Sequence, residues 1–407
     1  MRSSRGLAFV SPLLCLLVAF PAAAQDSPQP RARDLGVPYD GTPGQLNAIT
    51  DVAGVEVGLT TLIEGEPQDP DGTGPVRTGV TAIFPRGKDS PDNVFAAWFA
   101  LNGNGEMTGT TWIEESGFLE GPVMITNTHS VGVVRDAVVA WSAGRGELEL
   151  DFALPVVAET YDMLNDINGQ HVTAQHAFDA MNSASSGAVA EGNVGGGTGM
   201  ICHWFKGGTG TASRVLPNGY TVGVLVQCNY GSKDRLMVSG VPVGREIPGV
   251  PICWGPPAGH TGENPLPGLP RCGEDGDAPD GDRGSIIIVV ATDAPLLPHQ
   301  LKRLAKRASL GVGRMGGTGG NSSGDIFVAF STANAGAGTA EAVAELGMLP
   351  NGQIDPFFNA TIEATEEAIL NAMVAAEPMA GAYYLHSEAL PHDGLRAALR
   401  KYGRLVE

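Results

Sequence analysis

The stretch Met315 to Phe330, MGGTGGNSSGDIFVAF, places two serines between a glycine-rich loop and a strand. The glycines that precede the serines allow backbone angles that other residues avoid, so the loop can bend sharply. Ile326 to Phe330 is apolar and rich in β-forming residues, which predicts a short buried strand. Ser322 and Ser323 therefore stand where a pliable segment meets a rigid one, and we expect chemistry at this junction.

The composition indicates one large globular domain. Charged residues make up 17 % of the 407 residues, below the roughly 25 % of an average protein, and there are 57 glycines. Small apolar residues and many turns favour a tightly layered core, and no linker divides the chain. The net charge of −19 argues against a nucleic-acid or anionic-membrane partner, because either would favour a basic surface. Small molecules and peptides remain as partners.

The N-terminus has the pattern of an export signal. Arg2 and Arg5 precede the apolar run 7–20, and three alanines at 22–24 resemble a signal peptidase site. A membrane anchor is the alternative, but the run is short and no second apolar stretch of spanning length follows. We therefore expect residues 1–24 to be a signal peptide and the protein to be periplasmic or secreted.

The mature region, residues 25–407, is expected to be a single catalytic domain. It holds four cysteines, and an even number in an oxidising compartment permits disulfides. Cys253 and Cys272 flank a loop rich in Pro and Gly that such a bond would tie down. The spacing leaves the pairing open, because Cys202 and Cys228 are also available.

Hydrophobic periodicity predicts strands and helices in irregular alternation. Strands are expected at 47–62, 76–84, 93–101, 121–126, 154–157, 200–205, 220–227, 285–291 and 326–330. Helices are expected at 131–141, 174–181, 298–309, 340–346, 361–376 and 387–402. We expect 200–205 and 220–227 to pair as a hairpin, 249–282 to be a surface loop, and Gly311 to end the helix before it. This order favours a layered α/β or α+β sandwich over a repeat or a barrel.

Three patterns that suggest a metal or a cofactor do not meet their structural requirements. His171 and His176 lie five residues apart, whereas a helical zinc motif needs histidines four apart. The glycine-dense segment 191–210 lacks the Gly-Lys-Ser/Thr of a phosphate loop, since two glycines follow Lys206. Gly311-x-Gly313-x-x-Gly316 follows a helical segment and not the strand that a dinucleotide site requires. We therefore expect no metal and no cofactor.

The sequence around Ser322 also matches the nucleophile elbow G-x-S-x-G. Asp355 with His386 or His392 would complete a Ser-His-Asp hydrolase in the chain order of that fold. The elbow needs a strand before its serine and a helix after it, whereas here a loop comes first and a strand follows. The triad is therefore the alternative hypothesis.

The observed order suits a serine that cleaves the backbone in front of itself. A serine hydroxyl held against the preceding carbonyl can attack it, and hydrolysis of the resulting ester frees an α-amine beside that hydroxyl. Such an amine has an unperturbed pKa of roughly 7.7 to 8.0, so it can act as the base for its own hydroxyl near neutral pH. No histidine is required.

Several motifs in one order resemble a known family. They are ITDV at 49–52 followed by Gly54-Val55, TNTHS at 126–130, LNDING at 164–169, EGNVGGGTGM at 191–200, and Ser323-Gly324-Asp325 leading into AFSTAN. The chain resembles the self-processing serine aminopeptidases, which include β-aminopeptidases and L-aminopeptidase/D-amidase/esterases. The resemblance implies an α/β fold, a four-layer α-β-β-α sandwich like that of N-terminal nucleophile hydrolases, and a precursor that splits into two chains.

The resemblance also implies positions for the cleavage. It places the nucleophile at Ser323 and the cleavage between Ser322 and Ser323, which gives chains 25–322 and 323–407. A cut after Asn321 would transfer the nucleophile's role to Ser322, and the sequence leaves this choice open.

Further site residues are carried over in the same way. The oxyanion-stabilising Asn falls on Asn229, and the supporting Ser-x-Glu pair falls on Thr361 and Glu363, with Thr in place of Ser. We expect Glu363 to contact the amine or hydroxyl of Ser323, which requires the helix to begin at these residues.

Substrate recognition requires a negative charge. An aminopeptidase must bind a cationic amine, for which Glu159 and Glu106 are the candidates, with Tyr161 as a weaker contact.

These observations lead to one functional hypothesis. We expect an exported, self-cleaving aminopeptidase or amidase that releases N-terminal residues from short peptides or amino acid amides through an acyl-enzyme. Alternatives are the triad hydrolase using Ser322, an acyltransferase of the related fold, and a secreted binding protein. The resemblance implies a homo-oligomer of processed heterodimers. Preference among α-, β- and D-residues depends on pocket shape and stays open.

Overall fold

The computed structural model describes residues 29–148, 152–276 and 281–407. The predicted signal peptide, residues 1–24, lies outside them. Within the described residues, every helix is too short or too polar to cross a bilayer.

Two β-sheets form the middle of the molecule. The larger has the order β4-β3-β13-β12-β10-β9 and the smaller the order β1-β2-β5-β6. Strands of the larger sheet are β4 (Phe118–Leu119), β3 (Val94–Ala100), β13 (Ser322–Ser331), β12 (Arg283–Thr292), β10 (Thr221–Asn229) and β9 (Gly208–Val215). Strands of the smaller sheet are β1 (Glu56–Glu64), β2 (Val76–Phe84), β5 (Val123–Asn127) and β6 (Val156–Thr160). In each sheet one pair is parallel, β12 with β13 and β5 with β6.

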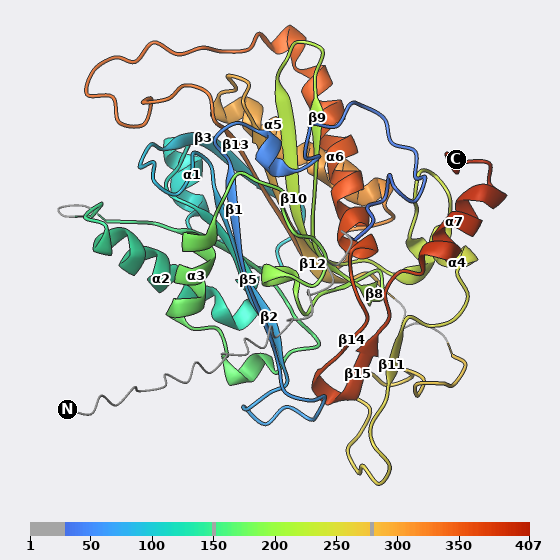
Figure 1. The fold of residues 1–407 in the computed structure, drawn as a ribbon. Coiled ribbons are helices and arrows are strands. Elements are labelled where there is room, and N and C mark those ends of the chain that lie inside the picture. The colour runs from blue at the N-terminus through green and yellow to red at the C-terminus, as the bar shows by residue number, and fades with distance from the viewer. Residues whose placement is uncertain (1–28, 149–151, 277–280) are drawn as a thin grey trace, which may run out of the picture.

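Helices cover the outer face of each sheet, as Figure 1 shows. Helices α2 (Val131–Gly144) and α3 (Ala174–Ser183) pack on the smaller sheet, and α5 (Pro298–Arg314) and α6 (Asp355–Val374) pack on the larger one. The remaining elements are α1 (Thr110–Ser116), α4 (Val243–Glu246), α7 (His392–Lys401), β7 (Ile201–Cys202), β8 (Phe205–Lys206), β11 (Ile252–Trp254), β14 (Met379–Ala380) and β15 (Leu385–Ser387). The expected four-layer α-β-β-α sandwich is confirmed.

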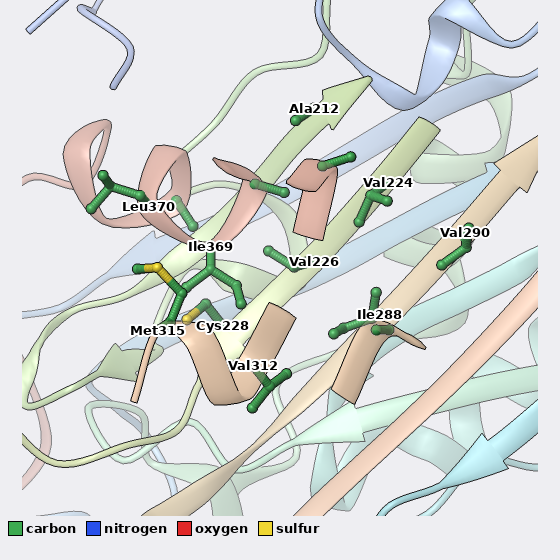
Figure 2. Close-up of a cluster of buried hydrophobic side chains, with 14 of the residues drawn as sticks. Ala212, Val224, Val226, Cys228, Ile288, Val290, Val312, Met315, Ile369 and Leu370 are labelled. Carbon is green, nitrogen blue, oxygen red and sulfur yellow. The ribbon is translucent and has the colours of Figure 1, made fainter. Parts of the chain in front are cut away.

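Strand β12 shows why the layers form. Its side chains alternate between the two faces of the sheet: Ile288 and Val290 face the helices, while Ile287 and Val289 face the smaller sheet. All four are fully buried, and burying each such side chain contributes about 1.5–3 kcal/mol. Figure 2 shows the helix-facing side chains of β10 and β12 against residues of α5 and α6. A strand that is apolar on both faces therefore belongs at the centre of a sandwich.

Two of the predicted elements are wrong. Strand β10 pairs with β9 and not with 200–205, because His203 and Trp204 adopt positive φ angles of 50° and 66° and turn the chain between β7 and β8. Residues 340–346 form no helix; Val343 is 99 % exposed, so their apolar residues have no surface to pack on.

Helix α5 does not end at Gly311 but continues to Arg314. A Cβ at Gly311 would lie 2.6 Å from the Cβ of Thr365, so glycine is needed there for close packing of α5 on α6. The glycine that was interpreted as a stop signal is therefore a contact between two helices.

Both possible disulfides are present, Cys202–Cys228 and Cys253–Cys272. The second ties the base of the 249–282 loop, as the sequence suggested, and this loop also contributes β11 to a small sheet with β15 and β14.

Candidate active site

Three strands of the larger sheet bring polar residues to one edge. Strands β12 and β13 begin there side by side, and β10 ends there because it runs antiparallel to β12. In register, Asn229 pairs with Ser285, and Ser285 pairs with Gly324. Segments far apart in the sequence therefore meet at the edge that includes the expected serines.

A cavity of about 600 Å³ opens at this edge. Five residues expected from the sequence line it: Glu106, Glu159, Tyr161, Asn229 and Ser322. The lining also includes Gly284 and Ser285, which the sequence reasoning missed, and an apolar wall of Met163, Ile201 and Trp204. Such a mixture of apolar wall and convergent polar groups is typical of a small-molecule site.

Asn229 is held in one orientation. Its Oδ1 accepts a hydrogen bond from the Ile201 N–H at 2.9 Å, and its Nδ2 donates to the Tyr161 carbonyl at 2.9 Å. Because a backbone N–H can only donate, the contact with Ile201 fixes which end of the amide is oxygen. An amide nitrogen carries two hydrogens, so Nδ2 has a second one to offer to a group in the cavity. Asn229 is therefore suited to stabilise a negative charge there.

Ser285 lies beside this amide at the start of β12. Its Oγ accepts a hydrogen bond from the Gly324 N–H at 3.0 Å, and the residue is 6 % exposed. Gly284, immediately before it, has φ of +96°. A Cβ on Gly284 would lie 1.9 Å from the Asn229 carbonyl oxygen and 3.2 Å from Asn229 Nδ2. Only glycine fits, and the peptide bond in front of Ser285 is thereby held against Asn229.

Gly284→Ala is expected to destabilise the fold strongly. A Cβ would meet the Asn229 carbonyl and would also require an unfavourable positive φ, each of which costs of order 1–3 kcal/mol. Gly281→Ala is the matched control, because Gly281 has φ of +101° but open space around its Cβ position. Urea unfolding of both variants measures the difference; equal losses of free energy of unfolding would contradict the close approach at Gly284.

Ser323 differs from Ser285 in its surroundings. It is fully buried, it is not among the residues that line the cavity, and its Oγ donates to Asp325 Oδ1 at 2.6 Å. Its N–H donates to the Gly320 carbonyl at 3.0 Å. The carbonyl of Ser322, which precedes it, accepts from Asn104 Nδ2 at 2.9 Å. The predicted nucleophile therefore faces a carboxylate inside the protein and not the cavity.

Asp325 was missed as a functional residue although it belongs to a motif quoted from the sequence. Burial raises its pKa to about 6, because removal from water disfavours the charged form. Ser323 and Asp325 are two apart on a strand, so their side chains share one face. That spacing is the signal that identifies the pair once β13 is known to begin at Ser322.

Glu159 forms a buried negative end of the cavity. Its Oε1 accepts the Glu106 N–H at 3.0 Å, its Oε2 accepts a short hydrogen bond from Thr128 Oγ1, and the residue is 3 % exposed. Burial raises the pKa of this carboxyl above its usual value. An ammonium group that entered the cavity would form a charge-assisted hydrogen bond with it. Tyr161 is 43 % exposed and uses its carbonyl to hold Asn229.

Thr361 and Glu363 do not lie at this cavity. Both are inside α6, which begins six residues before Thr361 and packs on the helix-covered face of the larger sheet. Thr361 Oγ1 donates to the Phe357 carbonyl at 2.8 Å, and Glu363 faces Arg214 with an Oε2–Nε distance of 3.6 Å. The expected contact between Glu363 and Ser323 is not formed, because the helix does not begin where that contact requires.

The residues of the alternative triad are also apart. His386 lies in β15 and pairs with Cys253, and His392 bonds the Val374 carbonyl through Nε2 at 2.9 Å. Neither is hydrogen-bonded to Ser322, and Asp355 opens α6. Within the described ranges, no group of three or more His, Cys, Asp or Glu side chains is arranged to hold a metal ion.

Fold and site together define a class of protein. Two central strands of an α-β-β-α sandwich carry serines within their first three residues at one sheet edge, and a fixed side-chain amide and a buried carboxylate face the same cavity. These are the features of a hydrolase with a variant of the N-terminal nucleophile fold.

The chain belongs to peptidase family S58, whose model matches residues 47–385, and it is a serine aminopeptidase. It is 57 % identical to the beta-peptidyl aminopeptidase BapA of Sphingosinicella microcystinivorans over 392 residues, which covers 95 % of this chain and 96 % of that protein. It is 47 % identical to the protein of that name from Sphingosinicella xenopeptidilytica over 397 residues, which covers 96 % of each.

Solved structures agree with this membership. The L-aminopeptidase D-Ala-esterase/amidase of Ochrobactrum anthropi, described as a prototype for the serine aminopeptidases, matches with a TM-score of 0.80 and 47 % identity, covering 93 % of this chain and all of that one. The β-aminopeptidase of a Burkholderia species matches with a TM-score of 0.79 and 46 % identity, covering 92 % and 99 %.

Proposed function

We propose that this serine aminopeptidase is exported, cleaves itself, and releases N-terminal residues from short peptides or amino acid amides through an acyl-enzyme. We further propose that the new N-terminal residue is Ser285. The observation that carries this assignment is that Ser285 lines the cavity beside Asn229, whereas Ser323 is buried against Asp325. The mature chains would be 25–284 and 285–407, in place of 25–322 and 323–407.

The contacts of the Gly284–Ser285 bond support the proposed self-cleavage. Ser285 Oγ attacks the Gly284 carbonyl carbon, and the proton that the hydroxyl loses passes to the amide nitrogen of Ser285 as the C–N bond breaks. The resulting ester joins Gly284 to Ser285 Oγ, and water hydrolyses it to a carboxylate on Gly284 and a free amine on Ser285. The Gly324 N–H, which already bonds Ser285 Oγ, favours loss of the hydroxyl proton from that oxygen during the attack.

The same groups would then act on a substrate. The Ser285 amine takes the hydroxyl proton, Oγ attacks the substrate carbonyl, and Asn229 Nδ2 stabilises the oxyanion. Glu159 binds the substrate's ammonium group and thereby selects a free N-terminus. The amine gives its proton to the leaving group, and water releases the acyl residue.

Asp325 and Ser323 would support the new amine. Gly284 pairs with Ser323 across the parallel strands, so Ser323 lies beside the bond that is cut. The Asp325 carboxylate accepts a hydrogen bond from the Ser323 hydroxyl, which leaves the lone pairs of Ser323 Oγ to face the amine of Ser285. This arrangement needs Asp325 in its ionised form.

The mass and the N-terminal sequence of the small chain test the proposal. Purified protein should give two bands on a denaturing gel, and the smaller should begin Ser-Ile-Ile-Ile. A small chain beginning Ser-Gly-Asp-Ile would assign the cut to Ser323, and one beginning Ser-Ser-Gly-Asp would assign it to Ser322. An intact chain with full activity would contradict self-processing.

The decrease in activity at acid pH should follow the protonation of Asp325; we call this part of the pH–activity profile its acid limb. Its pKa of about 6 lies above the ordinary value near 3.8, so the carboxyl is protonated below that pH and ionised above it. Activity is therefore expected to rise as the pH passes through about 6. Asp325→Asn should lower kcat by about 10²-fold or more and remove this limb. A limb near pH 6 that persists in the variant would contradict the assignment.

The raised pKa of Asp325 makes the stability of the fold change with pH in the opposite direction to the activity. Because folding raises the pKa of Asp325, this carboxyl favours the folded state most at low pH, and its contribution is lost as the pH rises through about 6. Asp325→Asn should therefore unfold at a higher temperature than the natural protein at pH 8, although it is less active.

The proposed location and substrates rest on separate grounds. The charge and apolar pattern of residues 1–24 support export to the periplasm or the medium. Two of the relatives are beta-peptidyl aminopeptidases, so β-amino acid amides are the first substrates to assay, beside α- and D-amino acid amides. The family likeness supports a homo-oligomer of processed pairs, which light scattering of the processed protein measures.

A further inference from the structure

The turn Asn102–Glu106 connects the two charged parts of the site. At one end Asn102 contacts Asp325, and at the other the Glu106 N–H donates to Glu159 Oε1 at 3.0 Å. Between them, Asn104 bonds the start of β13 through its side chain and its N–H. A single short segment of the chain thus touches the carboxylate near the serines and the carboxylate of the amine subsite.

Asn102 holds Asp325 through both ends of its amide. Its Oδ1 accepts the Asp325 N–H at 2.6 Å, and its Nδ2 donates to Asp325 Oδ2 at 3.2 Å and to the Gly320 carbonyl at 3.1 Å. With Oδ2 occupied in this way, Asp325 Oδ1 is the oxygen that faces Ser323 Oγ. The orientation of the buried carboxylate is therefore fixed by Asn102 at Oδ2, and this orientation directs Oδ1 toward Ser323 Oγ.

We propose that Asn102 is a positioning residue for catalysis: it orients Asp325 so that this carboxylate accepts the hydrogen bond from Ser323 Oγ. Asn102 does not line the cavity and so acts through Asp325 and not on the substrate. This inference rests on the proposed role of Asp325 above.

Besides burial, several neighbouring groups affect the pKa of Asp325. The Asp282 carboxylate raises it by repulsion, while hydrogen bonds from Ser323, Asn102 and the backbone of Ile286 lower it. Tyr230 also lies within electrostatic reach of Asp325, and burial first and then nearby carboxylates raise the pKa of its phenol. Asp282 and Tyr230 are unchanged when Asn102 is replaced by alanine, so a shift in the acid limb of Asn102→Ala reports the lost amide contact.

The isosteric variant Asn102→Asp is the sharpest test. An aspartate keeps an oxygen for the Asp325 N–H but loses the donation to Asp325 Oδ2 and adds a second negative charge beside it. Measured on processed enzyme, the acid limb should move up by about one pH unit or more, and kcat at pH 6.5 should fall about tenfold, with KM changed less than about threefold. Asn102→Ala should move the limb in the same direction. Thermal melts of both variants report whether they fold.

Asn193 supplies a matched control. Its amide also bonds a backbone carbonyl and a backbone N–H of one residue, Glu377, away from the site. Asn193→Ala therefore removes a similar two-ended contact and should leave the pH profile unchanged.

A double-mutant cycle with Asp325→Asn shows whether Asn102 acts through Asp325 or independently of it. If Asn102 acts through Asp325, Asn102→Ala should have no further effect on kcat in the Asp325→Asn background. The inference about Asn102 would be overturned if the two variants lowered kcat additively, or if Asn102→Asp left the acid limb at the same pH. Either result would leave the role of Asp325 intact. Full activity of Asp325→Asn alone would instead overturn the role of Asp325 and, with it, this inference.

Discussion

Ser285→Ala is expected to yield a single uncut chain with hydrolysis reduced at least about 10⁴-fold. The variant lacks the oxygen that attacks the Gly284 carbonyl, so neither the internal cut nor the acyl-enzyme can form. Among the described residues, the Ser285 hydroxyl accepts its hydrogen bond from the backbone N–H of Gly324. Removal of the hydroxyl costs this one bond, so we expect the variant to fold. A denaturing gel measures the cut, and release of an amine from β- and α-amino acid amides measures the activity.

Ser323→Ala is the matched control. It removes an equivalent hydroxyl from the neighbouring strand, and it should still give chains that separate before Ser285, although with lower activity because Asp325 loses its partner. If instead Ser323→Ala stays intact and Ser285→Ala splits, the nucleophile is Ser323, as the family likeness alone suggested.

Asn229→Asp is expected to lower kcat by about 10²- to 10³-fold with little change in KM. An aspartate keeps an oxygen for the Ile201 N–H but loses the donation to the Tyr161 carbonyl. It loses the Nδ2 hydrogens and brings a negative charge to the position where the oxyanion forms. Both changes act on the transition state and not on the bound substrate.

Asn229→Ala separates these two effects. It removes the donor without adding charge and should lose less activity than Asn229→Asp, while the Ile201 N–H is left without its acceptor. Steady-state kinetics on fully processed protein measure both variants. A rise in KM with an unchanged kcat would mean that Asn229 binds substrate and does not stabilise the oxyanion.

Much of the fold was predictable because its signals are local. In the predicted strand 285–291 every residue after Ser285 is apolar, so the run indicated a strand buried on both faces, and β12 is such a strand. The spacing in 131–141 predicted α2. The pairing of strands was harder to predict than the strands themselves. Residues 200–205 have the composition of a strand, but the positive φ angles of His203 and Trp204 show that the chain turns there.

The site was partly predictable for the same reason. Asn229, Glu159 and Ser322 were expected at the site and do meet at one cavity. The family likeness placed the supporting Ser-x-Glu pair on Thr361 and Glu363, which lie inside α6 and away from the cavity. Ser323 and Asp325 also have the Ser-x-acid spacing. In a helix such residues face different directions, whereas on β13 Ser323 and Asp325 share a face.

By itself, the sequence determined the layered fold, the family likeness and the presence of a serine that opens a strand after a flexible loop. That pattern occurs twice, at Ser285 after the 249–282 loop and at Ser323 after its glycines, and no local signal ranks one above the other. Only the tertiary structure distinguished them. Parallel pairing of β12 with β13 places the serines side by side, and the end of β10 adds Asn229 next to Ser285 while Ser323 is buried against Asp325. Which serine faces the cavity depends on neighbouring strands that are distant in the chain. The residues around each serine do not indicate which strands those neighbours will be.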